Sequence, residues 1–196
     1  GLEEALKIEN HYYQGALRKS PLAIKYLKSR GLTGKIAKEF SIGFAPNGWQ
    51  NLEQAFKKYE DKVLEKAGLI QKNDKNKFYD RFRNRIMFPI INEKGTVIGF
   101  GGRVIDSEDN PKYYNSPETP LFQKSYELYG LVYARKPIRE KSYVLVVEGY
   151  MDVVGLAQHG VRNVVATLGT ATTIYHLKKL MRYTQEIIFC FDGDSA

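Results

Sequence analysis

Three short segments in the last third of the chain constrain its fold more than any other feature. Residues 143–147 form an apolar run with almost no polar alternation, as expected for a strand that is covered on both faces. Residues 164–167 and 187–191 have the composition of two more strands, and helical spacing of apolar side chains separates the three over 153–158 and 174–183. Helices that alternate with buried strands predict a parallel β-α-β-α-β sheet.

The preceding part of the chain has a different pattern. Up to residue 70, apolar spacing and start signals such as Ser20 followed by Pro21 indicate short helices. Over residues 78–105 the period changes to two, which predicts strands joined by a hairpin turn at 92–95. A helix over 127–135 follows. We therefore expect an α/β protein with two parts. These are an N-terminal mixed α+β subdomain over residues 1–125 and a parallel sheet over residues 126–196.

Charge and cysteine content narrow the class of partner. The formal net charge is +8 and the pI is about 9.4, which favours a polyanionic partner, although many basic proteins have none. Cys190 is the only cysteine, so the sequence predicts no internal disulfide and no zinc site built from cysteines in this segment. This fits a reducing cytoplasm. No apolar run of 18 residues occurs, and we expect no contact with a membrane.

Three carboxylates follow predicted strands. Glu148 comes directly after the first strand of the parallel sheet, and Asp192 and Asp194 come directly after the third. Ligands collect beyond the carboxyl ends of parallel strands, so these side chains could converge on one point. They would repel one another unless a cation neutralised them, and hard oxygen ligands suit Mg²⁺ or Mn²⁺, with two ions supporting phosphoryl transfer. The alternative is that they are solvated acids in ordinary loops, one of which caps a helix.

A basic segment is the second candidate site. Residues 75–85 hold five basic side chains and one acid, and alternation would place Arg81, Arg83 and Arg85 on one face of a strand. Further basic residues follow, interleaved with tyrosines: Arg103, Lys112, Lys124, Tyr79, Tyr113 and Tyr114. Basic side chains beside aromatic rings suit single-stranded nucleic acid. The alternative is a solvated outer strand face with half-buried tyrosines.

Other residues favour structural roles. Gly99–Gly102 lacks the strand-to-helix context of a dinucleotide loop, and the three histidines show no spacing typical of metal ligands. We expect Cys190 to lie in the core, because it falls in the last apolar strand. We expect Trp49 to pack beneath the turn at Asn47 and Gly48.

Seven short motifs together carry a resemblance to a known family. Three lie in the parallel-sheet part: Glu148-Gly-Tyr-Met-Asp152, Ala166-Thr-Leu-Gly-Thr170 and Phe191-Asp-Gly-Asp194. Four lie upstream and are more specific: Gly43–Pro46, Asp80–Ile90, Gly99–Arg103 and Pro111–Thr119. Together they resemble the catalytic core of bacterial DnaG-type primases, including its Toprim module, and the resemblance covers nearly the whole chain. The Toprim signature alone is shared with topoisomerases, RecR-like proteins and some nucleases.

The resemblance implies a DNA-dependent RNA polymerase that synthesises short RNA primers on single-stranded DNA at the bacterial replication fork. Glu148 takes the position of the family's essential glutamate, and Asp192 and Asp194 match its metal-binding pair for Mg²⁺ or Mn²⁺. Arg103, Lys112, Tyr113 and Lys124 match its basic groove for template and nucleotide, and Arg81, Arg83 and Arg85 lie near that groove. The implied partners are single-stranded DNA template, ribonucleoside triphosphates, the RNA–DNA hybrid product and, through a domain not in this segment, the replicative helicase.

The family core continues beyond the position of Ala196, so we expect the parallel sheet to be incomplete and Ile188 or Phe189 to be exposed. We also expect the isolated chain to be inactive. Two other functions remain open at this stage. One is a catalytically incomplete module that only binds single-stranded DNA. The other is a different Toprim enzyme, a nuclease or a topoisomerase, although no motif nominates a nucleophilic tyrosine.

Overall fold

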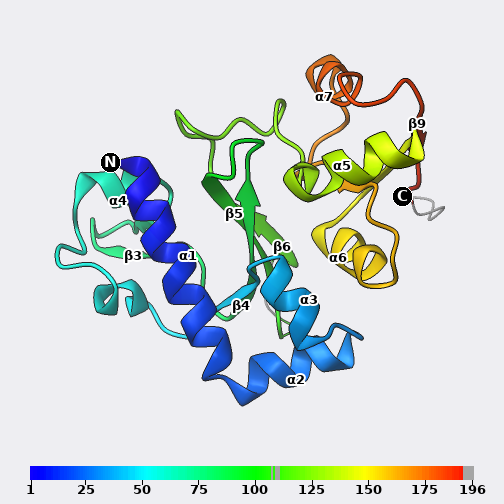
Figure 1. Cartoon of the computed structure of the whole chain (residues 1–196). Coiled ribbons are helices and arrows are strands. Elements are labelled where there is room, and N and C mark those ends of the chain that lie inside the picture. The colour runs from blue at the N-terminus through cyan, green and yellow to red at the C-terminus, as the bar shows by residue number, and fades with distance from the viewer. Residues whose placement is uncertain (107, 109–110, 192–196) are drawn as a thin grey trace. The chain divides into compact units, whose positions relative to one another are not determined.

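A computed structural model of the chain describes residues 1–106, 108 and 111–191. It has the predicted α/β class, and its contacts divide the chain into two units (Figure 1). The first unit contains Gly1–Ile90 and Val97–Phe122, and the second contains Ile91–Thr96 and Gln123–Ala196. In the described part of the chain, no helix is both long and apolar enough to cross a membrane.

The first unit is built on a four-stranded sheet of order β1-β4-β5-β6. Its strands are β1 (Gly43–Ala45), β4 (Arg85–Ile91), β5 (Val97–Val104) and β6 (Tyr113–Asn115). The hairpin turn between β4 and β5 is confirmed, since Asn92 accepts hydrogen bonds from the backbone of Lys94 and Thr96 and Gly95 has a φ of 85°. β4 is buried on both faces along most of its length, so its side chains do not alternate between core and solvent.

Helices cover this sheet and extend beyond it. They are α1 (Leu2–Arg18), α2 (Pro21–Ser29), α3 (Gly34–Glu39), the short 3₁₀ helix η1 (Asn51–Gln54) and α4 (Lys62–Lys66). As predicted, the Ser20 hydroxyl caps α2, accepting from the Ala23 amide. α1 packs on β1 so closely that a Cβ atom at Gly43 would lie 2.6 Å from Cβ of Tyr13, so this contact requires glycine. A second, two-stranded sheet pairs β2 (Ile70–Lys72) with β3 (Phe78–Asp80).

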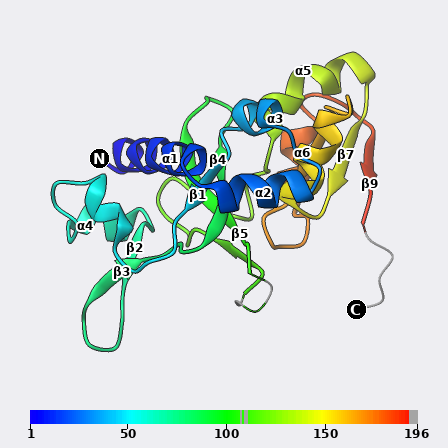
Figure 2. The same cartoon turned by 90° about the horizontal axis from the view of Figure 1, so that it is seen from below.

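The second unit contains the predicted parallel sheet, of order β8-β7-β9. Its strands are β7 (Val144–Val147), β8 (Val164–Ala166) and β9 (Ile187–Phe189), and its helices are α5 (Leu131–Lys141), α6 (Tyr150–Gln158) and α7 (Ile174–Leu180). α5 begins four residues later than the predicted helix at 127, because Gly130 has a φ of 87° and cannot continue a right-handed helix. Figure 2 labels β7 and β9 of this sheet from a second direction.

The β9 edge of this sheet is exposed. Ile188 and Phe189 have 38% and 45% of their surface accessible, as the sequence predicts. Cys190, which was expected in the core, is also exposed, so that prediction is wrong. Cys190 lies just after β9, which is an edge strand among the described residues and so has fewer neighbours to cover its side chains. β7 lies between two strands, and its Val144 and Val146 are fully buried.

Candidate nucleic-acid interface and carboxylate site

The three arginines after β3 do not form the predicted stripe on one strand. β3 ends at Asp80 and β4 begins at Arg85, so Arg81 and Arg83 lie in the connecting turn. Asn84 has a φ of 55°, which breaks the two-residue alternation on which the prediction rested. The prediction of a common strand face is therefore wrong.

The turn nevertheless brings the three arginines to one place. A polar hollow of about 310 Å³ is lined by Arg81, Arg83, Arg85, Gln71, Tyr114 and neighbouring residues. Arg81 donates to the carbonyl of Asn115 through Nε at 3.1 Å and Nη2 at 2.6 Å, and its guanidinium lies 4.1 Å from the centre of the Tyr114 ring. Arg85 is buried and donates to the carbonyls of Pro111 and Gly102. Backbone oxygens hold these two guanidinium groups in place, and among the described residues no carboxylate lines the hollow beside them.

Trp49 stands beside this hollow and was not among the predicted site residues. Its side chain is 63% exposed, so the prediction that it packs beneath a turn is wrong. Gly48, with a φ of 137°, turns the chain so that the indole points outward. The guanidinium of Arg83 lies 3.9 Å from the centre of the Trp49 ring, and Tyr79 packs edge-on against the same ring at 5.7 Å. A held, solvent-exposed indole beside fixed cations is the arrangement on which a nucleic-acid base can stack.

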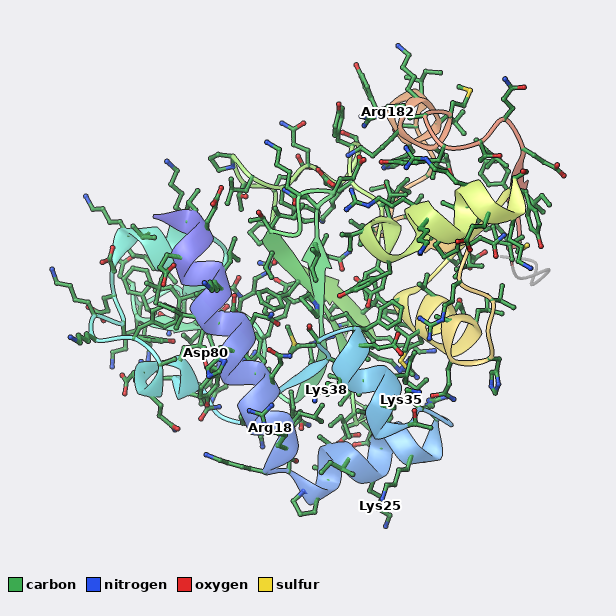
Figure 3. All side chains as sticks on the ribbon, viewed as in Figure 1. Arg18, Lys25, Lys35, Lys38, Asp80 and Arg182 are labelled. Carbon is green, nitrogen blue, oxygen red and sulfur yellow. The ribbon has the colours of Figure 1, made fainter. Side chains whose placement is uncertain are left out.

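Asp80, which is labelled in Figure 3, links the Trp49 segment to the arginine turn. Its amide donates to the Trp49 carbonyl at 2.7 Å. Its carboxylate accepts from the Tyr59 hydroxyl at 2.7 Å and from the Leu52 amide at 3.2 Å. Burial raises the pKa of Asp80 to about 6, although these hydrogen bonds oppose the shift. Asp80 therefore positions the exposed indole without reaching solvent itself.

Arg103 on β5 organises a second cluster in the same unit. β5 and β6 pair so that Arg103 is opposite Tyr113, and the guanidinium donates to the Tyr113 hydroxyl at 2.8 Å and to the hydroxyl of Tyr26 on α2. Lys112 Nζ lies 5.7 Å from the centre of the Tyr113 ring, which is itself 42% exposed. The structure thus brings together three of the predicted groove residues, and adds Tyr26, whose only sequence signal was an aromatic position on a basic helix.

Lys124 belongs to the second unit, where its backbone has a structural role. The Lys124 carbonyl lies 2.9 Å from Nε2 of His176, and the His176 side chain also accepts from the amide of Thr173 as part of the α7 cap. Burial lowers the pKa of His176, which favours the neutral ring that this cap requires. His176 is accordingly a structural residue, as the sequence predicts.

Glu148 lies where the parallel sheet would place a ligand. It directly follows β7, the central strand, and its side chain is exposed. It lines a hollow of about 640 Å³ together with Thr167, Gly169, Thr170, Ala171, Thr172, Phe189 and Phe191. Asp192 and Asp194 fall outside the described residues. Within the described ranges, no group of three His, Cys, Asp or Glu side chains could hold a metal ion. The single described carboxylate at the strand end fits a hard cation only with further oxygen ligands.

Two family models match the chain. The model described as DNA primase catalytic core, N-terminal domain, matches residues 12–135, and the Toprim domain model matches residues 142–196. The DNA primase of Legionella pneumophila is 55% identical over 188 residues, which cover 95% of this chain and 32% of that protein. The chain thus spans about a third of the length of this curated relative.

Solved structures of DNA primases are also similar to this chain. A DNA primase domain from Pseudomonas aeruginosa has a TM-score of 0.92 and 51% identity, covering 100% of this chain and 62% of that one. A structure described as the DnaG primase catalytic domain bound to single-stranded DNA has a TM-score of 0.88 and 46% identity, covering 98% of this chain and 61% of that one.

The fold and the site together define the class of protein. A parallel sheet with a glutamate after its central strand, matched by the Toprim model, places the second unit among Toprim domains. The first unit carries the match that is specific to primases. The chain belongs to the family of bacterial DnaG-type DNA primase catalytic cores.

Proposed function

We propose that the chain is the template-binding and metal-binding part of a DNA primase, which synthesises short RNA primers on single-stranded DNA. The observation that carries the proposal is the exposed Trp49 indole, held by Arg83 and Tyr79 beside an arginine-lined hollow. A single strand offers both unstacked bases and a phosphate backbone, and this surface has a group for each. The relatives named DNA primase, and the primase structure described as bound to single-stranded DNA, support the same function.

In this proposal, each part of the surface has a separate task. A base stacks on Trp49, and phosphates of the strand are drawn to Arg81, Arg83 and Arg85. Arg103, Lys112, Tyr113 and Lys124 contact the template or the triphosphate of the incoming ribonucleotide. Arg103 suits this task because two tyrosine hydroxyls fix its guanidinium, which lowers the conformational entropy lost when an anion binds.

The catalytic centre in this proposal lies at Glu148. Glu148 and the predicted ligands Asp192 and Asp194 hold Mg²⁺ or Mn²⁺, with two or more ions during the reaction. When bound, such ions neutralise the charge that develops during phosphoryl transfer. The exposed position of Glu148 at the end of the central strand, at the mouth of a wide hollow, supports this assignment.

The whole protein would act at the bacterial replication fork. Its proposed partners are the single-stranded template, ribonucleoside triphosphates, the RNA–DNA hybrid and the replicative helicase. Ribonucleotide incorporation on a single-stranded template, measured beside cleavage of the same DNA, separates a primase from a nuclease or a topoisomerase. Metal-independent DNA binding without either reaction would indicate a binding module instead.

The DNA surface is tested by substitution at Trp49. Stacking of one base contributes about 1–3 kcal/mol, so Trp49→Ala should weaken binding of an oligothymidylate roughly five- to 150-fold. Trp49→Phe keeps an aromatic ring and should retain most of the affinity. Leu22→Ala removes an equally exposed apolar side chain from α2 and is the matched control. Equal affinities for the Trp49→Ala and Leu22→Ala variants would exclude the proposed surface.

A further inference from the structure

A separate feature of the first unit is a strongly basic face on its first three helices. Between residues 10 and 52, the sequence has seven lysines and arginines but one acid, Glu39. The basic residues are Arg18, Lys19, Lys25, Lys28, Arg30, Lys35 and Lys38, and all seven side chains are exposed. Four of them, from the end of α1, from α2 and from α3, are labelled in Figure 3. This short segment has a net charge of +6, against +8 for the whole chain.

An apolar hollow of about 470 Å³ lies among these helices. Six aliphatic side chains line it: Leu17, Ile24, Leu27, Leu32, Ala37 and Ile42. Three cationic side chains also line it, those of Arg18, Lys28 and Lys38. None of these three cations has an ion pair or side-chain hydrogen bond to any residue that the structure describes. The hollow therefore combines an apolar floor with a rim of unpaired positive charge.

This chemistry differs from that of the Trp49 surface. Bases stack on aromatic rings and on arginine planes, but no aromatic side chain lines this hollow. A nucleic-acid strand offers only thymine methyl groups and sugar carbons, which are too small to fill an aliphatic pocket of this volume. A polypeptide with acidic residues on either side of one bulky apolar residue matches both the apolar floor and the cationic rim of the hollow. The apolar residue fills the pocket, and the carboxylates pair with the cations of the rim.

We propose that this hollow is a docking site for an acidic peptide segment of a partner protein, anchored by one bulky apolar side chain. The proposal goes beyond the proposed primase function and does not depend on it. α2 presents Ile24 and Leu27 to the hollow, whereas Tyr26 of the same helix contacts Arg103. The docking site therefore uses a different side of α2 from the nucleotide-facing cluster.

The test uses a fluorescent synthetic peptide, rich in aspartate and glutamate, with a single central leucine. Fluorescence anisotropy should show saturable binding to the chain, weakened by salt. Replacing the peptide's leucine with serine should weaken binding roughly ten- to a hundredfold, since the anchor loses its burial. Equal binding of the two peptides would overturn the proposal, because it would show charge attraction without a pocket.

Two variants of the protein test the site itself. The double substitution Lys28→Glu with Lys38→Glu should weaken binding of the leucine peptide about tenfold or more. The control, Lys62→Glu with Lys66→Glu, makes the same change of charge at exposed positions of α4 and should affect peptide affinity much less. Gly34→Phe should fill the hollow. Gly34 also lines it, and a Cβ atom there meets nothing within 4 Å, so the substitution should not disturb the fold. Gly34→Ala is its control. Unchanged peptide affinity in Gly34→Phe would overturn the proposal.

The same variants distinguish other occupants. If Gly34→Phe weakens binding of an oligothymidylate as strongly as it weakens binding of the peptide, the hollow binds nucleic acid and the proposal is wrong. If sedimentation velocity shows self-association that Gly34→Phe abolishes, the face is an interface between copies of this chain, and the proposal is wrong again. Trp49→Ala should leave peptide affinity unchanged, which separates this result from failure of the DNA surface.

Discussion

Substitution of Asp80 by asparagine should change the pH dependence of stability in a predictable direction. Asp80 is buried and accepts hydrogen bonds from Tyr59 and Leu52, and its pKa is raised from 3.8 to about 6. The folded protein therefore binds a proton at Asp80 more tightly than the unfolded chain does. The stabilisation from this proton is complete below the unfolded pKa of 3.8 and is lost as the pH rises through about 6.

The size of the effect follows from the two pKa values. The linkage relation gives almost no contribution at about pH 7, about 2 kcal/mol at pH 4.5, and about 3 kcal/mol at lower pH. In Asp80→Asn this site no longer titrates, while every other ionisable group is retained. The stability of the wild-type chain relative to the variant should therefore rise by about 2 kcal/mol between pH 7 and pH 4.5.

Urea unfolding at these two pH values measures the difference directly. Trp49 is the only tryptophan and its segment is bound to Asp80, so its fluorescence reports the transition. Circular dichroism provides a second probe of the same transition. A wild-type advantage that stays constant, or that shrinks as the pH falls, would refute the reasoning. It would mean that attraction to Arg83, and not burial, sets the pKa of Asp80.

Three further predictions concern the packing, the basic surface and the metal. Gly43→Ala should lower the free energy of unfolding by about 1–3 kcal/mol, because its Cβ would overlap Tyr13; unchanged urea unfolding would contradict the close packing of α1 on β1. Lys112→Ala with Lys124→Ala should flatten the slope of log affinity for single-stranded DNA against log salt by about 1.4, and an unaltered slope would mean that neither lysine touches the strand. Asp192→Asn should weaken Mn²⁺ binding measured by calorimetry, and unchanged affinity would remove Asp192 from the proposed ligands.

The parallel sheet could be predicted from sequence because its strands are short apolar runs separated by amphipathic helices. Burial on both faces dictates this pattern, and β7 and β8 follow it closely. Glu148 could be placed for the same reason, since a residue after a parallel strand has a fixed location at the sheet edge. Periodicity is informative wherever one structural element continues through the whole segment.

The arginine turn shows where periodicity fails. Arg81, Arg83 and Arg85 alternate perfectly in sequence, but β3 ends at Asp80 and the left-handed residue Asn84 breaks the alternation before β4 begins at Arg85. An asparagine in that position was the available signal, because asparagine tolerates the left-handed region better than most residues. Arg81 and Arg85 are held by tertiary hydrogen bonds to Asn115, Pro111 and Gly102, and Arg83 lies against the Trp49 ring. No local pattern encodes these contacts.

Trp49 shows a second limit. A large apolar residue after a turn is usually buried, and nothing nearby in sequence marks this one as exposed. Its position depends on Arg83 and Tyr79, which are about thirty residues away in the chain. Asp80 adds a backbone contact from the same distant segment. Long-range contacts of this kind require the structure.

Trp49 fluorescence tests the central claim most directly, because the chain contains one tryptophan and the proposed surface is built around it. An oligothymidylate carrying a fluorescent label reports binding by anisotropy, and the unlabelled strand is then added while tryptophan emission is recorded. If a base stacks on Trp49, its emission should be quenched with the same midpoint as the anisotropy titration. Saturable DNA binding that leaves Trp49 emission unchanged would contradict the account.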